Sequence, residues 1–152
     1  MEDNTNKFEF QIKGIFVTNF NLNLCDEFIK ADQKTERGFN NYTFEVTCIN
    51  NVAVPDNILN IEVVIKIFLD VEKKVILGSL KIGNVFSINN LKTYYDEKNN
   101  VLNLPPDIEA SLIGISLSHA RAILLAKCAG TFLQNAVLPI LDPKAFIKKL
   151  NK

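Results

Sequence analysis

The N-terminal part of the chain alternates apolar and polar side chains over an unusual length. From residue 8 to residue 24, the even positions read Phe, Phe, Ile, Gly, Phe, Thr, Phe, Leu, Leu. The odd positions are largely polar and include Asn19, Asn21 and Asn23. Successive side chains of a β-strand point to opposite faces, so the pattern predicts one long strand with one apolar face. A typical strand has about five or six residues, and this length indicates a large or curved sheet, or a surface offered to another chain.

Three further segments show a similar alternation of apolar and polar residues. They lie near residues 39–50, 58–71 and 74–88. Gly78 and Gly83 interrupt the last of these, and we expect a bulge or a close approach of neighbouring atoms at these two positions. The connections are short, including a charged hairpin predicted at residues 72–74, and this favours an antiparallel sheet.

After these strands the periodicity becomes helical. The segment 89–106 contains paired asparagines and two consecutive prolines, which predicts a crossover loop. A long helix is predicted from Asp107 to a C-terminal glycine, Gly130, with residues 114–118 as a candidate kink. Asp142 and the proline after it predict the N-cap and first turn of a short C-terminal helix.

This order of elements predicts an α+β fold: a four-stranded antiparallel sheet followed by a long helix and a short C-terminal helix. We expect a single domain over residues 1–152, with a flexible N-terminus at 1–7. Residues 122–126 are apolar all round, so the long helix needs cover on more than one side. Other copies of the chain are therefore expected against the helix layer. The predicted oligomer contacts are Leu117, Ala120, Ile123 and Leu124.

Charge and cysteine content narrow the classes of function. Basic and acidic residues both number 17, so no net charge attracts nucleic acid or an anionic membrane. The start of the sequence is polar and acidic, unlike a signal peptide, and no strongly apolar stretch is long enough to predict insertion into a membrane. Three widely spaced cysteines fit a reducing compartment, which predicts a cytoplasmic protein.

Residues that carry chemistry are sparse. The single histidine, His119, has no nearby carboxylate or cysteine arranged as a ligand set, so a structural or solvent-facing role is favoured over a catalytic or metal role. Ser116 and Ser118 lie in no nucleophile motif, and no phosphate-binding glycine loop is present. Cys25 and Cys128 fit small core residues. We therefore predict no catalytic residues, no metal site and no cofactor, and an enzyme or small-ligand pocket is the least favoured hypothesis.

The distinctive chemistry is aromatic, with eleven phenylalanines and three tyrosines. Most should lie in the core, but several fall at predicted strand ends or in loops, where a monomer could not easily bury them all. These are Phe20, Phe28, Phe39, Tyr94, Tyr95 and Phe132. An exposed aromatic cluster usually marks a docking site for apolar polypeptide or ligand.

Several segments of the sequence resemble the SecB family of protein-export chaperones. They are residues 10–16, the GNVFSI segment at 83–88, the stretch from Ala120 and Arg121 through residues 130–132 to Leu138 and Pro139, and Phe146. The resemblance covers about residues 8 to 150. It implies a four-stranded antiparallel sheet, pairing of two protomers into an eight-stranded sheet, and a dimer of dimers with the long helices between the sheets.

The resemblance also implies a function. A SecB-like protein would be an ATP-independent holdase whose apolar grooves bind unfolded or non-native polypeptides through apolar burial and backbone pairing. The candidate client-binding residues are the six aromatics above together with Leu22, Tyr42 and Phe44. A second hypothesis keeps the fold but assigns it to an interaction subunit that binds one fixed, folded partner.

The resemblance has one clear departure. The export chaperones present carboxylates on the sheet to the motor ATPase SecA, and the matching positions of this chain are Asn19, Asn23, Leu77 and Ser79. None of these residues is charged, which disfavours delivery to SecA. Solitary SecB-like proteins that protect a labile antitoxin have the client-binding groove but do not deliver clients to SecA. Two hypotheses therefore stay open, a chaperone of general clients and a chaperone of one antitoxin.

Overall fold

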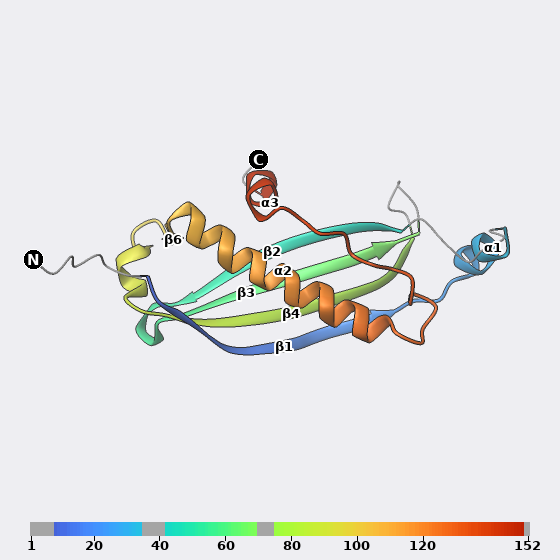
Figure 1. Cartoon of the computed structure of the whole chain (residues 1–152), viewed down its shortest axis with the longest axis horizontal. Helices are drawn as coiled ribbons and strands as arrows, with labels where there is room; N and C mark the ends of the chain where they lie inside the picture. Colours follow the sequence, from blue (N-terminus) through green and yellow to red (C-terminus); the bar gives the residue numbers. More distant parts are fainter. Residues whose placement is uncertain (1–7, 35–41, 70–74, 151–152) are drawn as a thin grey trace, which may run out of the picture.

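A four-stranded antiparallel sheet forms one layer of the molecule, and a long helix crosses one of its faces (Figure 1). The computed structural model describes residues 8–34, 42–69 and 75–150. The strands are β1 (Phe10–Leu22), β2 (Thr43–Ala53), β3 (Ile58–Phe68) and β4 (Ile76–Ile88). Their order in the sheet is β1-β4-β3-β2, so β1 and β2 are the edge strands.

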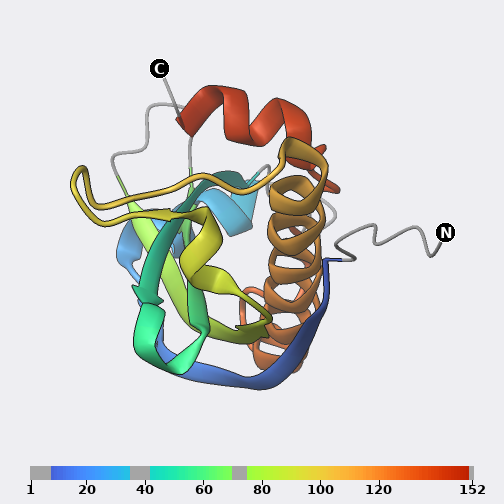
Figure 2. The same cartoon turned by 90° about the vertical axis from the view of Figure 1, so that its left-hand side faces the viewer.

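Three α-helices are described. They are α1 (Asp26–Lys34), α2 (Pro106–Cys128) and α3 (Pro143–Leu150). Figure 2 shows α2 as a second layer beside the sheet and α3 lying across one end of α2. This arrangement confirms the predicted α+β fold, with the long helix and the short C-terminal helix after the strands. Helix α1 is not among the elements that the sequence pattern predicts.

The crossover between β4 and α2 holds more structure than a loop. It contains the 3-10 helix η2 (Leu91–Tyr94) and a small hairpin of β5 (Tyr95–Asp96) and β6 (Val101–Leu102). Another 3-10 helix, η1 (Val54–Asp56), joins β2 to β3. Asn90 and Asn100 adopt left-handed backbone conformations, with φ of 57° and 55°. The paired asparagines are therefore turn residues, as predicted.

The core lies between α2 and the two central strands. Alternate side chains of β3 and β4 face α2, because neighbouring strands share the same pleat. These fully buried residues include Leu59, Ile61, Val63, Ile65, Ile67, Leu80, Ile82, Phe86 and Ile88. Full burial of each such side chain stabilises the fold by about 1.5 to 3 kcal/mol. The predicted alternation in β3 and β4 is confirmed, although the charged hairpin at 72–74 lies outside the described residues.

Strand β1 departs from the simple alternation. Its pairing with β4 shifts register between Ile12 and Gly14 and again between Val17 and Asn19. Each shift inserts one extra residue, which exchanges the two faces of the strand. The side chains on the α2 side of β1 are consequently Phe10, Ile12, Ile15, Val17, Phe20 and Leu22. The prediction that every even position shares one face was wrong in the middle of the strand, where Phe16 lies on the opposite face.

Helix α2 is continuous from Pro106 to Cys128, so the candidate kink at 114–118 is not formed. The hydroxyls of Ser116 and Ser118 donate to the carbonyls of Leu112 and Gly114, 2.9 Å away in each case. These bonds to carbonyls four residues earlier satisfy both serines inside a regular helix. The predicted C-terminal glycine is confirmed, since Gly130 has a φ of 73° just beyond the helix end.

Among the described helices, α2 is long and apolar enough to cross a membrane by length and composition alone. Every window of eighteen residues in α2 nevertheless contains the charged Arg121, so the prediction that no such window is free of charged residues is not contradicted. The structure gives a physical reason for the apolar composition, because Leu112, Leu117 and Leu124 of α2 are buried against the sheet. A core helix that packs on more than one side has the same composition as a membrane span.

Two glycines of β4 allow close approaches, as predicted. A Cβ atom at Gly78 would lie 2.9 Å from Cδ1 of Leu133, and one at Gly83 would lie 3.0 Å from Oδ1 of Asn60. Real Cβ contacts of this length are very rare, so both positions favour glycine. Gly78 therefore lets the segment after α2 pack directly on the sheet.

Helix α3 is fixed to α2 at its first turn. Oδ1 of Asp142 accepts a hydrogen bond from the backbone N–H of Lys144 (2.9 Å), which confirms the predicted N-cap. Nζ of Lys144 lies 2.8 Å from Oδ1 of Asp107, and its hydrogen bond and charge lower the pKa of that carboxyl. A lowered folded-state pKa stabilises the fold at neutral pH, and the stabilisation is lost as the pH falls through that pKa. Both groups are exposed, so the effect is small.

Candidate functional site

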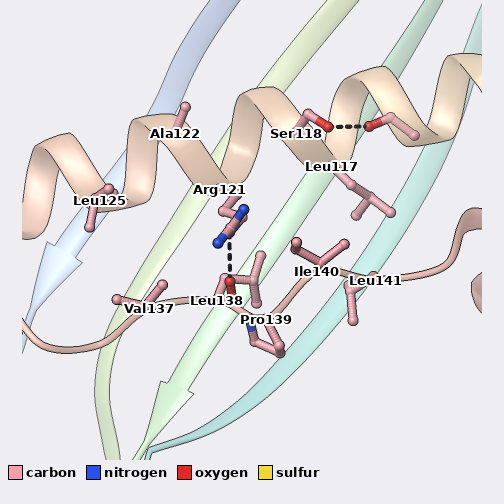
Figure 3. Close-up of a pocket in the computed structure, with 11 residues that line it drawn as sticks. Leu117, Ser118, Arg121, Ala122, Leu125, Val137, Leu138, Pro139, Ile140 and Leu141 are labelled. Atoms are coloured by element: carbon pink, nitrogen blue, oxygen red, sulfur yellow. Dashed lines mark hydrogen bonds between the residues drawn. The ribbon is translucent and has the colours of Figure 1, made fainter.

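An apolar groove of about 320 Å³ lies between α2 and the extended segment 137–141 (Figure 3). We call it the α2 groove. One wall is a single face of α2, because its residues recur at helical spacing. They are Gly114, Leu117, Ser118, Arg121, Ala122 and Leu125. The other wall is the segment 137–141, whose sequence is VLPIL.

The rim of the α2 groove exposes large apolar side chains. The exposed fraction is 82% for Ile140, 50% for Leu125 and 47% for Val137. Single exposed apolar residues are common on protein surfaces, but three around one groove form a patch. The shape and apolar lining of this groove are those that suit an apolar ligand or polypeptide segment.

The wall formed by residues 137–141 is a backbone segment outside the helices and strands. Among the described residues, no hydrogen-bond partner is seen for the backbone N–H groups of Val137, Leu138, Ile140 and Leu141. Pro139 has no N–H to donate. The carbonyl of Leu138 accepts a hydrogen bond of 2.9 Å from Nε of Arg121, which ties this wall to α2. An extended polypeptide lying in the groove could therefore pair with backbone as well as bury side chains.

A second apolar surface follows the edge strand β1. Ile12, Ile15 and Val17 are on the α2 side of the sheet but are exposed, because α2 packs over β3 and β4 rather than over β1. We call these three residues the β1 strip. The bulge between Ile12 and Gly14 places Ile12 on the same face as Ile15 and Val17, so the strip is continuous along the middle of the strand.

The predicted client-binding residues fall in several places, and none of them lines the α2 groove. Phe28 of α1 is buried against Phe132, with ring centroids 5.0 Å apart in an edge-to-face arrangement. Phe20 lies beneath Nζ of Lys127, 6.0 Å from the ring centroid. Leu22 is exposed near Gly78. Phe20 and Leu22 lie at the end of β1 that leads into α1, and Phe28 belongs to α1 itself.

Among the remaining predicted residues, Phe44 lies in the same row of the sheet as Leu22, whereas Tyr94 and Tyr95 belong to the crossover between β4 and α2. Tyr94 packs against Phe8 with ring centroids 5.6 Å apart, and the hydroxyl of Tyr95 donates to Oδ1 of Asn100 in the crossover hairpin. Tyr42 and Phe44 are half-buried at the start of β2, and Phe39 lies outside the described residues. The predicted set therefore joins aromatic residues from opposite ends of the sheet and does not form one groove.

The predicted oligomer contacts are mostly internal to the protomer. Leu117, Ala120 and Leu124 are buried between α2 and the sheet, and Ile123 is half-buried against the same core. Ala120 and Leu124 cannot contact another copy while α2 stays packed on the sheet, whereas Leu117 is buried but also lines the α2 groove. Sequence reasoning missed Leu125, Val137 and Ile140, although the apolar run at 136–141 was visible.

The positions that match the motor contacts of the export chaperones are uncharged. The polar side chains of Asn19 and Asn23 make hydrogen bonds within the molecule. Oδ1 of Asn19 accepts a hydrogen bond from Nδ2 of Asn21 (2.6 Å), and Nδ2 of Asn23 donates to the carbonyl of Ile76 (3.1 Å). Leu77 is buried and Ser79 is half-buried. These contacts leave no carboxylate at any of the matching positions.

The carboxylates on the open face of the sheet are paired. Glu62 lies 2.9 Å from Nζ of Lys81, and Glu45 lies 3.5 Å from Nζ of Lys66. This surface is therefore a mixed polar face in which each of these acids has a basic neighbour. It differs from an acidic surface that attracts basic partners.

His119 has a structural partner. Its Nδ1 lies 2.9 Å from Oδ1 of the buried Asn84, and Nδ2 of Asn84 donates to the carbonyl of Ile61 over 3.2 Å. Because the amide nitrogen already serves as donor, Nδ1 of His119 is the donor to Oδ1. Among the described residues, no group of three or more His, Cys, Asp or Glu side chains could hold a metal ion.

Cys48 and Cys128 are poor nucleophiles. Burial raises the pKa of the Cys48 thiol to about 12 and also raises the pKa of Cys128. The reactive form of cysteine is the thiolate, so these two side chains behave as small apolar groups at neutral pH. The part of the chain that the structure describes contains three free cysteines, and no disulfide links them.

The molecule therefore has the fold class of an antiparallel sheet covered by one long helix, with an open apolar groove on the outer side of that helix. A solved structure with this fold is the SecB-like chaperone Rv1957 of Mycobacterium tuberculosis, in complex with a ChAD peptide from the Rv1956 HigA1 antitoxin. The superposition covers 87% of this chain and 89% of that one, with a TM-score of 0.56 and 9% sequence identity. The predicted SecB-like fold is thus confirmed. No protein-family model and no curated protein sequence matches the chain.

Proposed function

We propose that the protein is a SecB-like chaperone that holds extended, apolar segments of non-native polypeptides in the α2 groove. The observation that carries the proposal is the groove itself, in which exposed apolar side chains stand beside the extended backbone of residues 137–141. The fold supports it, because the structural neighbour is a chaperone. The open groove favours this function over an interaction subunit with one fixed, folded partner.

The physical basis of binding is burial rather than recognition of one sequence. Covering the exposed parts of Leu125, Val137 and Ile140 contributes on the order of 1 kcal/mol each. Backbone pairing along residues 137–141 adds affinity without regard to the side chains of the client. Neither term depends on a nucleotide, so holding and release follow from the affinity alone, as in an ATP-independent holdase.

The partner class is polypeptide. The neighbouring structure contains a peptide from an antitoxin, which supports a labile antitoxin as one client class for this protein, beside general unfolded chains. The export motor SecA is disfavoured as a partner, because the matching positions are uncharged and Glu45 and Glu62 are already paired. We place the protein in the cytoplasm on the basis of its cysteine usage.

The test of the proposed function is suppression of aggregation. A chemically denatured model protein is diluted into buffer with increasing amounts of the purified protein and without nucleotide, and light scattering is followed. We expect scattering to fall to near the baseline at stoichiometric ratios. Undiminished scattering at a large excess of the protein contradicts the proposal and favours the interaction-subunit hypothesis.

We also propose that a second copy of the chain covers the β1 strip. The other edge of the sheet is less open, because the β5–β6 hairpin lies beside residues 50–52 of β2. The β1 edge has no such neighbour among the described elements and carries exposed Ile12, Ile15 and Val17. Pairing through this strip would leave the α2 groove open on each copy, and the proposal applies equally to a dimer and to a dimer of dimers.

Val17→Lys is expected to weaken self-association, because it places a charge in the middle of the apolar β1 strip. We expect the dissociation constant between copies to rise by about tenfold or more. Sedimentation velocity over a range of concentrations measures the change. Ile49→Lys is the matched control, since Ile49 is similarly exposed but lies on the other edge strand. Equal association of wild type and Val17→Lys would contradict the proposed interface.

A further inference from the structure

One charged side chain lines the α2 groove. Arg121 stands at the middle of the helical wall, and the other residues that line the groove are apolar apart from Ser118. The hydroxyl of Ser118 already donates to the carbonyl of Gly114. Arg121 is therefore the only side chain lining the groove that can direct a strong polar interaction at a bound segment.

The guanidinium of Arg121 is only partly satisfied. Its Nε donates to the carbonyl of Leu138 over 2.9 Å, and this bond fixes the guanidinium between the two walls of the groove. Within the described residues, its two terminal nitrogens make no hydrogen bond and no ion pair. A guanidinium has five N–H donors, so four stay available in a planar arrangement that suits a carboxylate.

Nearby carboxylates do not compete for Arg121. Asp107 pairs with Lys144 at 2.8 Å, and Oδ1 of Asp142 caps α3. No Asp or Glu lines the groove. Helix α3, which begins just after the groove wall, carries the exposed basic residues Lys148 and Lys149 in its last turn. The one charged side chain that lines the groove is therefore positive.

We infer that the α2 groove prefers extended client segments in which an acidic side chain stands between apolar residues, and that Arg121 determines this preference. The inference rests on the proposed function, because it specifies which polypeptides the same groove holds. The apolar walls bind the flanking side chains, and the half-buried guanidinium binds the carboxylate through charge-assisted hydrogen bonds. Partial burial makes this pair stronger than a fully exposed one, because less water screens it.

The test compares two fluorescently labelled nonapeptides with blocked ends and identical apolar residues. One has aspartate at its centre and the other has asparagine, which is close to the same shape but uncharged. Fluorescence anisotropy measures the binding of each peptide to the full-length protein. We expect the aspartate peptide to bind about fivefold more tightly at low salt, with the ratio decreasing as salt is added.

Substitutions then assign the preference to one side chain. In Arg121→Gln, the aspartate and asparagine peptides are expected to bind equally. Loss of the bond from Arg121 to the carbonyl of Leu138 should lower both affinities by a similar factor, so the ratio of the two affinities is the readout. Arg121→Lys keeps the charge and should retain part of the preference. Lys98→Gln is the matched control, because it removes one exposed cation from the crossover loop, away from the groove. It should leave the ratio unchanged.

The outcomes separate this inference from the proposed function. Equal binding of both peptides to the wild type overturns the acidic preference and leaves the groove as a general apolar site. A preference that persists in Arg121→Gln overturns the role of Arg121. Failure of both peptides to bind overturns the proposed function together with the inference.

Discussion

The combined substitutions Leu125→Ser, Val137→Ser and Ile140→Ser are expected to reduce the affinity for unfolded clients by about a hundredfold. The three side chains supply most of the exposed apolar surface of the α2 groove. Each is exposed, so their replacement should change the free energy of unfolding of the protein itself only slightly. Suppression of aggregation by the triple variant, compared with the wild type at equal concentration, measures the loss.

The control for the triple variant removes a similar amount of apolar surface elsewhere. Ile49, Ile76 and Val101 are each about as exposed as Leu125 and lie away from the α2 groove. Their joint replacement by serine should leave suppression of aggregation nearly intact. If both triple variants lose the activity equally, binding depends on the apolar surface in general and the α2 groove is not the client site.

The neighbouring substitutions Leu124→Ala and Leu125→Ala are expected to have very different effects on stability. Leu124 is 0% exposed within the core, whereas Leu125 is 50% exposed at the rim of the groove. Truncation of a buried leucine costs about 2 to 5 kcal/mol of unfolding free energy, because it removes contacts and leaves a cavity. The exposed leucine should cost less than about 1 kcal/mol. Urea unfolding of the two variants measures the difference.

This pair also separates the core of the protomer from a contact between copies. If Leu124 lies in the core, the loss of stability in Leu124→Ala is the same at every protein concentration, whereas an interface residue gives a concentration-dependent loss. Leu125→Ala should show the reverse functional pattern, with reduced client affinity and nearly normal stability. Similar stability losses for both variants would contradict the packing of α2 on the sheet.

The central strands and the helix ends were predictable from the sequence because local rules decide them. β3 and β4 are covered on the α2 side, and strict alternation places their apolar residues there. The N-cap at Asp142 and the glycine after α2 at Gly130 follow from local backbone chemistry. These features need no knowledge of distant parts of the chain.

The course of β1 was not predictable in the same way. Apolar residues occupy both odd and even positions in its middle, with Ile15 and Val17 on one face and Phe16 on the other. After a bulge, the side chains of a strand lie on the opposite face from the one that simple alternation predicts. Only the pairing with β4 shows where the bulges occur. Helix α1 was missed because it is short and polar, and because Phe28, which packs against Phe132, is far from its partner in sequence.

The α2 groove could not be predicted because it depends on tertiary packing. Leu124 and Leu125 are adjacent residues of the same type. Only the rotational orientation of α2 on the sheet decides which of the two is exposed. The segment 137–141 reads as an apolar run without periodicity, and its position beside α2 depends on the tight packing of Leu133 at Gly78. The aromatic residues drew attention in the sequence, but packing places most of them in or against the core.

The bonds of His119 and Arg121 have a mechanical consequence for α2. Two residues apart on a helix, these side chains project about 200° from each other. His119 is hydrogen-bonded to Asn84 in the sheet, and Arg121 is hydrogen-bonded to the carbonyl of Leu138 in the segment 137–141. The two hydrogen bonds hold α2 from two opposite sides. Rotation of the helix about its own axis would break both of them. The α2 groove would then keep its shape on binding, and a client segment would have to adapt its own conformation to it.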